Sequence, residues 1–186
     1  RIPDMEFILH CKKLGIKTAM PVSMALRLYP KLIIVRGDWT WYKQCSEGFM
    51  EICRSYSPVL QKFSIDECFI DMTFRLYRKD PAEVACRLKD EVREKLGFTV
   101  NVGVGSNKLL AKMASDFEKP DKVHTLWSEE VPEKMWPLPV GDLLWVGKKT
   151  REKLTGYGIR TIGDLAKIQT KALTSIVGKT FAAQLH

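Results

Sequence analysis

The sequence has no apolar run that approaches the ~20 residues a membrane-spanning helix requires. Its first residues also lack the order of charged, apolar and small residues that marks a secretory signal peptide. We therefore expect a cytoplasmic protein with no membrane partner. Internal repeats and low-complexity tracts are missing as well, which argues against a repeat or fibrous architecture.

Patterned cysteine is a further absence. The chain has 5 cysteines, and no two of them form a C-x-x-C pair. An odd and scattered set is typical of reduced core thiols and not of a disulfide framework or a zinc site. These cysteines are Cys11, Cys45, Cys53, Cys68 and Cys86.

What the sequence does have is positive charge and enough apolar residues for a core. The net charge is +8, and the pI is about 9.3. This balance favours a polyanionic partner such as nucleic acid, although many basic proteins bind none. With 45% hydrophobic residues in 186, the chain can form one large domain or two small ones.

Two adjacent carboxylates stand out in the stretch Gln61–Thr73. Asp66 and Glu67 lie in a run of Phe, Ile and Cys, where acidic residues are rare unless a cation compensates them. A metal ion, a basic side chain or open solvent could each supply that compensation. Carboxylate oxygens suit Mg²⁺, so a metal site for phosphoryl transfer is our leading interpretation.

The backbone must turn for both carboxylates to approach one site, because neighbouring side chains in a strand face opposite ways. The flanking stretches Val59–Ile65 and Cys68–Met72 are apolar and predict a β-hairpin. A turn at Asp66 and Glu67 between these strands supplies the required geometry. The bland alternative is a solvated acidic hairpin tip.

The order of the elements predicts an α+β fold, a sheet with helices packed on one face. Gly15 is a candidate for the end of an early helix, and Asn107 for a helix cap. Further helices are expected over Val22–Leu28, Trp41–Tyr56, Pro81–Leu96 and Lys108–Asp116, and further strands over Leu32–Val35, Phe98–Val104 and Val123–Leu126.

The composition changes after Trp127. Three prolines at positions 132, 137 and 139 predict a connecting stretch, and only short helical patterns follow it. We expect a second, all-helical domain there. Its helices are predicted over Val140–Trp145, Lys148–Tyr157, Thr161–Lys167, Ala172–Val177 and Lys179–Leu185.

Several of these stretches resemble one known family. FSIDECFID (Phe63–Asp71), VGVGSNKLLAKMASD (Val102–Asp116) and EKPD (Glu118–Asp121) resemble the palm of Y-family translesion DNA polymerases, the bacterial DNA polymerase IV and V group. KKLGIKTAMP (Lys12–Pro21) is similar to the end of that family's fingers. GKKTREKLTGYGIRTIGDLA (Gly147–Ala166) is similar to its thumb, which carries a helix-hairpin-helix.

The resemblance implies template-directed nucleotide addition past DNA damage, and it divides the chain into partial fingers (1–38), palm (39–127) and thumb (128–186). Asp66 and Glu67 match two of the family's metal carboxylates, which hold two Mg²⁺ ions per active site. Lys119 matches a lysine that contacts the incoming deoxynucleoside triphosphate. Lys12 stands where the family has a triphosphate-binding arginine, so it keeps the charge without the bidentate fork.

The expected partners are therefore primer–template DNA and a deoxynucleoside triphosphate. A sliding clamp is a further partner that the resemblance allows, through regions outside this chain. A helix-hairpin-helix presents backbone N–H groups to DNA phosphates, and basic side chains nearby add ionic contacts. Its candidate DNA-binding residues are Gly147, Lys148, Lys149, Arg151, Gly156 and Gly158.

The sequence also departs from the family pattern. Leu9 replaces a tyrosine of the fingers, Ala19 replaces a glycine near the templating base, and Trp145 replaces the first glycine of a Gly-x-Gly turn. The strand with the family's first catalytic aspartate would precede Arg1, and the last DNA-gripping domain would follow His186. We therefore expect this chain to be inactive as a polymerase by itself.

Two alternative functions remain open from the sequence. A non-catalytic DNA-binding module would keep the basic helix-hairpin-helix and use a degenerate palm as a scaffold. A nucleotide cyclase on a related palm would need no DNA contact, and the stretch Gly147–Ala166 argues against it.

Overall fold

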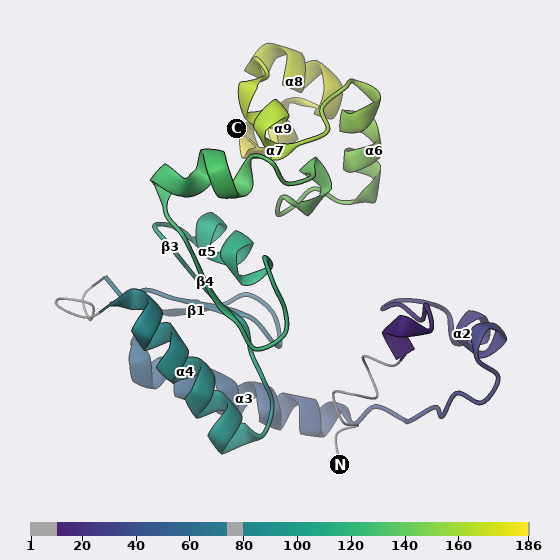
Figure 1. Cartoon of the computed structure of the whole chain (residues 1–186), viewed down its shortest axis with the longest axis vertical. Helices are drawn as coiled ribbons and strands as arrows, with labels where there is room; N and C mark the ends of the chain where they lie inside the picture. Colours follow the sequence, from purple (N-terminus) through teal and green to yellow (C-terminus); the bar gives the residue numbers. More distant parts are fainter. Residues whose placement is uncertain (1–10, 74–79, 186) are drawn as a thin grey trace. The chain divides into compact units, whose positions relative to one another are not determined.

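The structure of the chain is a computed structural model that describes residues 11–73 and 80–185 (Figure 1). The chain divides into two compact units, Arg1–Thr40 and Trp41–His186. The predicted departure at Leu9 lies outside the described residues. The finer division into fingers, palm and thumb stays a prediction.

The first unit contains helix α2 (Val22–Leu28), with the predicted bounds. Gly15 ends the turn before it with a φ of 83°, as expected for a helix C-terminal glycine. The predicted strand over Leu32–Val35 is wrong, because this stretch has no strand pairing among the described residues. Its three β-branched residues, Ile33, Ile34 and Val35, are 58–68% exposed instead.

The second unit begins its core with a helix on a hairpin. Helix α3 (Trp39–Tyr56) packs on strands β1 (Leu60–Lys62) and β2 (Cys68–Ile70), which pair in antiparallel register. The predicted hairpin is confirmed, with shorter strands. Two buried serines connect the hairpin to α3 and the residue after it. Ser46 Oγ donates to the Ile65 carbonyl, and Ser57 Oγ donates to the Asp71 carbonyl.

The remaining helices and strands of this α+β region follow the predicted order. Helix α4 (Pro81–Leu96) has the predicted bounds, since Asp80 caps it and Pro81 opens it. Strands β3 (Val102–Gly105) and β4 (Val123–Leu126) pair in parallel, separately from β1 and β2. Helix α5 (Lys108–Ser115) lies between them in sequence and is capped by Asn107.

The helices cover both sides of the β3–β4 pair. Val102 faces the apolar cluster that α3 and α4 share, and these two helices lie side by side (Figure 1). The alternating glycines Gly103 and Gly105 face α5, and a Cβ on Gly103 would lie 2.5 Å from the backbone nitrogen of Ser115. Side chains alternate across a strand, so α5 lies against the face opposite α4. The expected placement on one face holds for α3 and α4 only.

The last third of the chain is all-helical, as predicted. The proline-rich stretch expected as a connection is itself made of helical turns, η1 (Ser128–Glu130) and η2 (Val131–Met135). The predicted helix over Val140–Trp145 shortens to one turn, η3 (Val140–Asp142). The other helices are α6 (Lys148–Gly156), α7 (Ile162–Lys167), α8 (Thr170–Val177) and α9 (Lys179–Leu185).

One buried apolar cluster joins these helices to α5 and β4. It includes Leu110 and Met113 of α5, Leu126 of β4, and Leu154 and Leu173 of the helical region. The helical region and α5 therefore fold around a common core. None of the helices in the described ranges is long and apolar enough to span a membrane.

Candidate functional site

The two carboxylates lie in the turn of the β1–β2 hairpin. Lys62 pairs with Cys68, so residues 63–67 form the loop. The Glu67 carbonyl accepts hydrogen bonds from the backbone nitrogens of Phe63 and Ser64, at 2.9 and 3.1 Å. The predicted turn is therefore present, and it frees Asp66 from the strict alternation of a strand.

The structure gives the two carboxylates different partners. Asp66 Oδ1 accepts a hydrogen bond of 2.6 Å from Ser64 Oγ. Glu67 Oε1 lies 2.6 Å from Lys112 Nζ, which reaches it from helix α5. Of the three compensations that the sequence left open, a basic side chain is the one that this structure shows for Glu67.

The ion pair at Glu67 continues into a network of four charges. Lys112 Nζ lies 3.0 Å from Asp116 Oδ2, and the other oxygen of Asp116, Oδ1, lies 2.6 Å from Lys119 Nζ. We call Glu67, Lys112, Asp116 and Lys119 the charge network. It connects one predicted metal carboxylate to the predicted triphosphate-binding lysine.

Burial and charge oppose each other at the two inner members of the network. Burial alone would lower the pKa of Lys112, but its bonds to Glu67 and Asp116 outweigh burial and hold that pKa above its usual value. Burial would raise the pKa of Asp116, but the bonds from Lys119 and Lys112 outweigh burial and hold that pKa low. Both groups are therefore stabilised in their charged forms.

The turn suits Mg²⁺ in ligand type and access. Its side chains offer carboxylate oxygens, the ligands that Mg²⁺ prefers, and the Glu67 side chain is 38% exposed. No group of three or more His, Cys, Asp or Glu side chains that could hold a metal occurs within residues 11–73 and 80–185. These residues therefore fit a divalent ion as a partial ligand set, with Lys112 as a competing cation at Glu67.

An aromatic contact joins the hairpin turn to the start of the helical region. The ring of Phe63 meets those of Phe69 and Trp145 edge-on, at centroid distances of 5.5 and 5.8 Å. Trp145 has a φ of 75°, in the left-handed region that favours glycine. The residue that replaces a family glycine thus adopts the glycine conformation, and so does Ala19, with a φ of 62°.

The candidate DNA-binding residues lie at the two ends of α6. Gly147 caps its N-terminus, and the side chains of Lys148, Lys149 and Arg151 are exposed in its first turns. None of these three side chains has a hydrogen bond or an ion pair with another described residue. The helix start therefore presents unneutralised positive charge to solvent.

The loop after α6 closes in a regular helix-ending motif. The backbone nitrogen of Ile159 donates to the Leu154 carbonyl, and that of Gly158 donates to the Thr155 carbonyl, while Gly158 has a φ of 84°. A Cβ on Gly147, Gly156 or Gly158 would meet no described atom within 4 Å. The surface at these three positions is therefore open.

Two other lysines have contacts that the sequence did not settle. Lys108, at the start of α5, donates to Gln61 Oε1 of β1. Lys12, of the first unit, is exposed, and its carbonyl accepts a hydrogen bond of 3.0 Å from the nitrogen of Gly15. The side chain of Lys108 thus bridges α5 and β1 in the same way as Lys112 reaches the hairpin turn.

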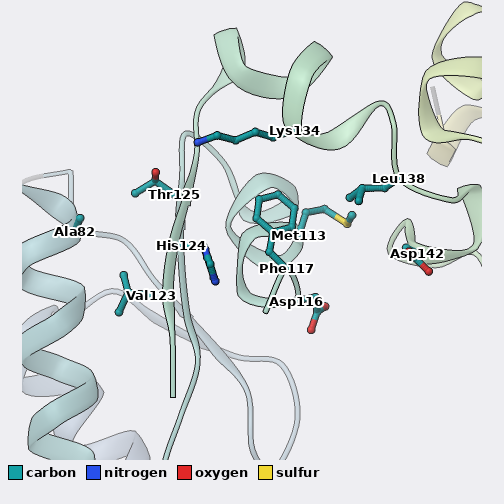
Figure 2. A pocket seen from close by; sticks show the side chains of 10 residues that line it. All are labelled: Ala82, Met113, Asp116, Phe117, Val123, His124, Thr125, Lys134, Leu138 and Asp142. Carbon is teal, nitrogen blue, oxygen red and sulfur yellow. The ribbon is translucent and has the colours of Figure 1, made fainter. Parts of the chain in front are cut away.

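A cavity of about 910 Å³ borders the network at Asp116 (Figure 2). Its lining includes Phe117, His124 and Asp142, and the rings of Phe117 and His124 meet edge-on at 5.9 Å. His124 Nε2 is buried and has no hydrogen-bond partner among the described residues. The cavity leaves one side of Asp116 open, in agreement with the 40% exposure of its side chain.

Comparison with known proteins decides the family. A sequence profile of the impB/mucB/samB family matches residues 9–116, more than half of the chain. The chain belongs to the impB/mucB/samB family. A second profile, the helix-hairpin-helix (HHH) motif of the same IMS family, matches residues 128–159. The Y-family resemblance of the palm and thumb motifs is therefore confirmed.

Curated relatives in this family are DNA polymerases. DNA polymerase IV of Clostridium acetobutylicum is 43% identical over 162 residues, which cover 87% of this chain and 41% of the relative. DNA polymerase IV 1 of Bacillus subtilis is 40% identical over 164 residues, 88% of this chain and 40% of the relative. The chain spans about two fifths of the length of these relatives.

Solved structures of the family have the same fold. DinB from Sulfolobus solfataricus matches with a TM-score of 0.87 and 29% identity, over 95% of this chain and 52% of that one. An insertion ternary complex of Dbh DNA polymerase matches with the same TM-score and identity, over the same shares of the two chains. The predicted α+β fold class is confirmed.

Sequence reasoning missed the connections between the site residues. Lys112 and Asp116 entered it only as members of the stretch Val102–Asp116, and neither was assigned a partner. It also missed Ser46, although this polar residue falls on the apolar stripe of α3, three positions before Phe49. A polar residue at a buried position of a helix is the one signal that could have revealed that contact.

Proposed function

We propose that the protein carrying this chain is a translesion DNA polymerase that adds nucleotides to a primer under the direction of a template. The single observation that carries this proposal is the hairpin turn that presents Asp66 and Glu67, joined through Lys112 and Asp116 to Lys119, in a chain of the impB/mucB/samB family. The polymerase relatives and the ternary complexes among the solved structures support it.

In this proposal, the side chains of Asp66 and Glu67 hold Mg²⁺ through their oxygens. Bound Mg²⁺ supplies activation of the attacking hydroxyl and neutralises charge on the transferred phosphoryl group. Lys119 binds the phosphates of the deoxynucleoside triphosphate, and a like role for Lys12 stays a prediction from the family resemblance. Lys119 suits this role because its side chain is 56% exposed and its Nζ is paired with one carboxylate, that of Asp116.

The start of α6 binds the DNA backbone. Lys148, Lys149 and Arg151 are exposed beside the open N-terminus of the helix, where backbone N–H groups and positive side chains favour phosphate. Glycine at 147, 156 and 158 leaves this surface without side chains that would keep a DNA strand away. Primer–template DNA is therefore the proposed partner, recognised by its backbone and without reading its sequence.

The partial ligand set limits what this chain does alone. Because the described residues bring no third metal-binding side chain to Asp66 and Glu67, we expect the 186-residue chain to extend primers poorly by itself. A sliding clamp stays a prediction from the family resemblance, and the contacts of the described residues do not bear on it.

The test is primer extension with Mg²⁺ by the protein that carries this chain and by its D66A and E67A variants. We expect each variant to lose extension by about a hundredfold or more, because the proposed metal loses an oxygen ligand, while its circular dichroism spectrum stays unchanged. Extension at the unsubstituted rate by either folded variant would refute the metal assignment. Template-independent addition would refute the assignment as a template-directed polymerase.

A further inference from the structure

The charge network has two inner members that contact neither the proposed metal nor the proposed triphosphate. Lys112 is the more buried of the two, with a side chain that is 15% exposed. It neutralises Glu67 at 2.6 Å and also contacts Asp116 at 3.0 Å. A cation this buried is unstable without a carboxylate partner, so it needs one in every state of the site.

Asp116 is the second inner member of the network, between Lys112 and Lys119. One of its oxygens contacts Lys112 and the other contacts Lys119, so its two partners do not compete for one atom. Lys112 lies in the last turn of α5, and Asp116, four positions later, caps the C-terminal end of the helix, so the two side chains lie on the same side. The pair can therefore persist whether or not the outer partners are present.

We propose that Lys112 and Asp116 are a placeholder pair. Lys112 occupies the place of a metal ion at Glu67, and Asp116 occupies the place of a phosphate at Lys119, as long as neither ligand is bound. When Glu67 turns to a metal and Lys119 turns to a triphosphate, Lys112 and Asp116 neutralise each other. The two inner charges keep a partner in both states, and no proton moves.

This arrangement couples the two outer groups. If Glu67 no longer attracts Lys112, then the Lys112 ammonium interacts more strongly with the Asp116 carboxylate. Asp116 in turn attracts Lys119 less strongly. Lys119 is then more available for phosphate. The inference rests on the proposed function in one respect, because it takes Lys119 as the group that binds the triphosphate.

The coupling can be measured without any metal. Inorganic triphosphate is titrated in EDTA against the unsubstituted protein, E67Q and D66N. Both variants remove one negative charge from the same turn, but only Glu67 contacts Lys112. We expect E67Q to tighten triphosphate binding about threefold and D66N less than about 1.5-fold, the scale of partly exposed ion pairs.

A second background tests the path of the coupling. In D116N, Lys119 has lost its carboxylate, so we expect triphosphate to bind about threefold more tightly and E67Q to add nothing further. In K112Q, E67Q and D66N should have equal effects. The isosteric Gln and Asn preserve side-chain volume, and circular dichroism of each variant checks that the chain is folded.

Equal effects of E67Q and D66N in the unsubstituted background would overturn the placeholder pair, and so would full additivity of E67Q and D116N. Loss of primer extension in E67A with either of these results would leave the proposed polymerase intact while the inference fails. Failure of triphosphate to bind, with K119Q also without effect, would overturn both the placeholder pair and the assignment of Lys119.

Discussion

Helices α5 and α6 both begin with a lysine, and they differ in how they use their charge. Each is short, each follows a glycine-containing strand or turn, and each carries basic residues in its first turns. In α5, Lys108 and Lys112 reach across to the β1–β2 hairpin. In α6, Lys148 and Lys149 face solvent. Lysines of a helix can therefore hold other elements of the same chain in place, or they can stay exposed and available to a partner.

The glycines beside the two helices differ in the same way. Gly103 and Gly105 of β3 lie against α5, and a Cβ on either would lie within 2.7 Å of helix backbone. A Cβ on Gly147 before α6 would meet no described atom within 4 Å. One set of glycines allows protein to pack on protein, and the other leaves space at the surface.

The largest effect should come from filling the space under α5. We expect G103A to lower the free energy of unfolding by about 3 kcal/mol, because the new Cβ would overlap the Ala111 carbonyl and crowd the Ser115 nitrogen, which are backbone atoms that cannot move aside. The matched variant G147A should change it by less than about 0.5 kcal/mol. Urea unfolding followed by circular dichroism measures both.

Equal destabilisation by the two alanines would break the comparison, since it would mean that Gly147 is as crowded as Gly103. A small effect of G103A would show that α5 can shift away from β3. That shift would also move Lys112 from Glu67.

The next effect concerns DNA. We expect K148Q/K149Q to weaken binding of a primer–template duplex about tenfold at 0.15 M salt and to reduce the slope of log K against log salt by about 2, because two phosphate contacts are lost. The charge-matched K108Q/K112Q should change the slope by less than about 0.5, since those lysines contact Gln61 and Glu67 instead. Fluorescence anisotropy over a salt series gives both slopes.

A larger slope change for the α5 variant would reverse the comparison. It would place the DNA path along α5, and the exposed lysines of α6 would then serve solubility only.

The smallest effect isolates backbone strain at the start of the helical region. W145A removes the ring contact with Phe63 and keeps a residue with a Cβ at a φ of 75°, whereas W145G removes both the contact and the strain. We expect W145G to be more stable than W145A by about 1 kcal/mol. Thermal unfolding of the two variants measures this difference, and a less stable W145G would mean that the left-handed conformation costs nothing here.

The segments with end signals in the sequence were predicted with the right bounds. Helix α4 has Asp80 and Pro81 at its start and Gly97 just after its end, and α2 and β4 also kept their predicted bounds. Leu32–Val35 has strand-forming residues but no partner strand among the described residues, so its prediction was wrong. Strand propensity is a property of one segment, whereas a strand also requires a second segment with which to pair.

The candidate site shows the same difference between local sequence signals and contacts made in the fold. Its carboxylates, its triphosphate lysine and its basic helix start were identified from motifs in the sequence, and they stay predictions until they are tested. The partners of these residues could not be identified, because Lys112 and Glu67 are 45 positions apart and meet only once α5 packs on β3.

The sequence by itself determined the family, the α+β order followed by short helices, and the turn that holds Asp66 and Glu67, because these depend on local patterns of charge, proline, glycine and apolar residues. The tertiary structure alone decided which charges neutralise one another, that the helical region shares a core with α5, and that Trp145 adopts a glycine conformation against Phe63. Those features depend on contacts between residues far apart in the sequence, and local sequence patterns do not determine which distant residues meet.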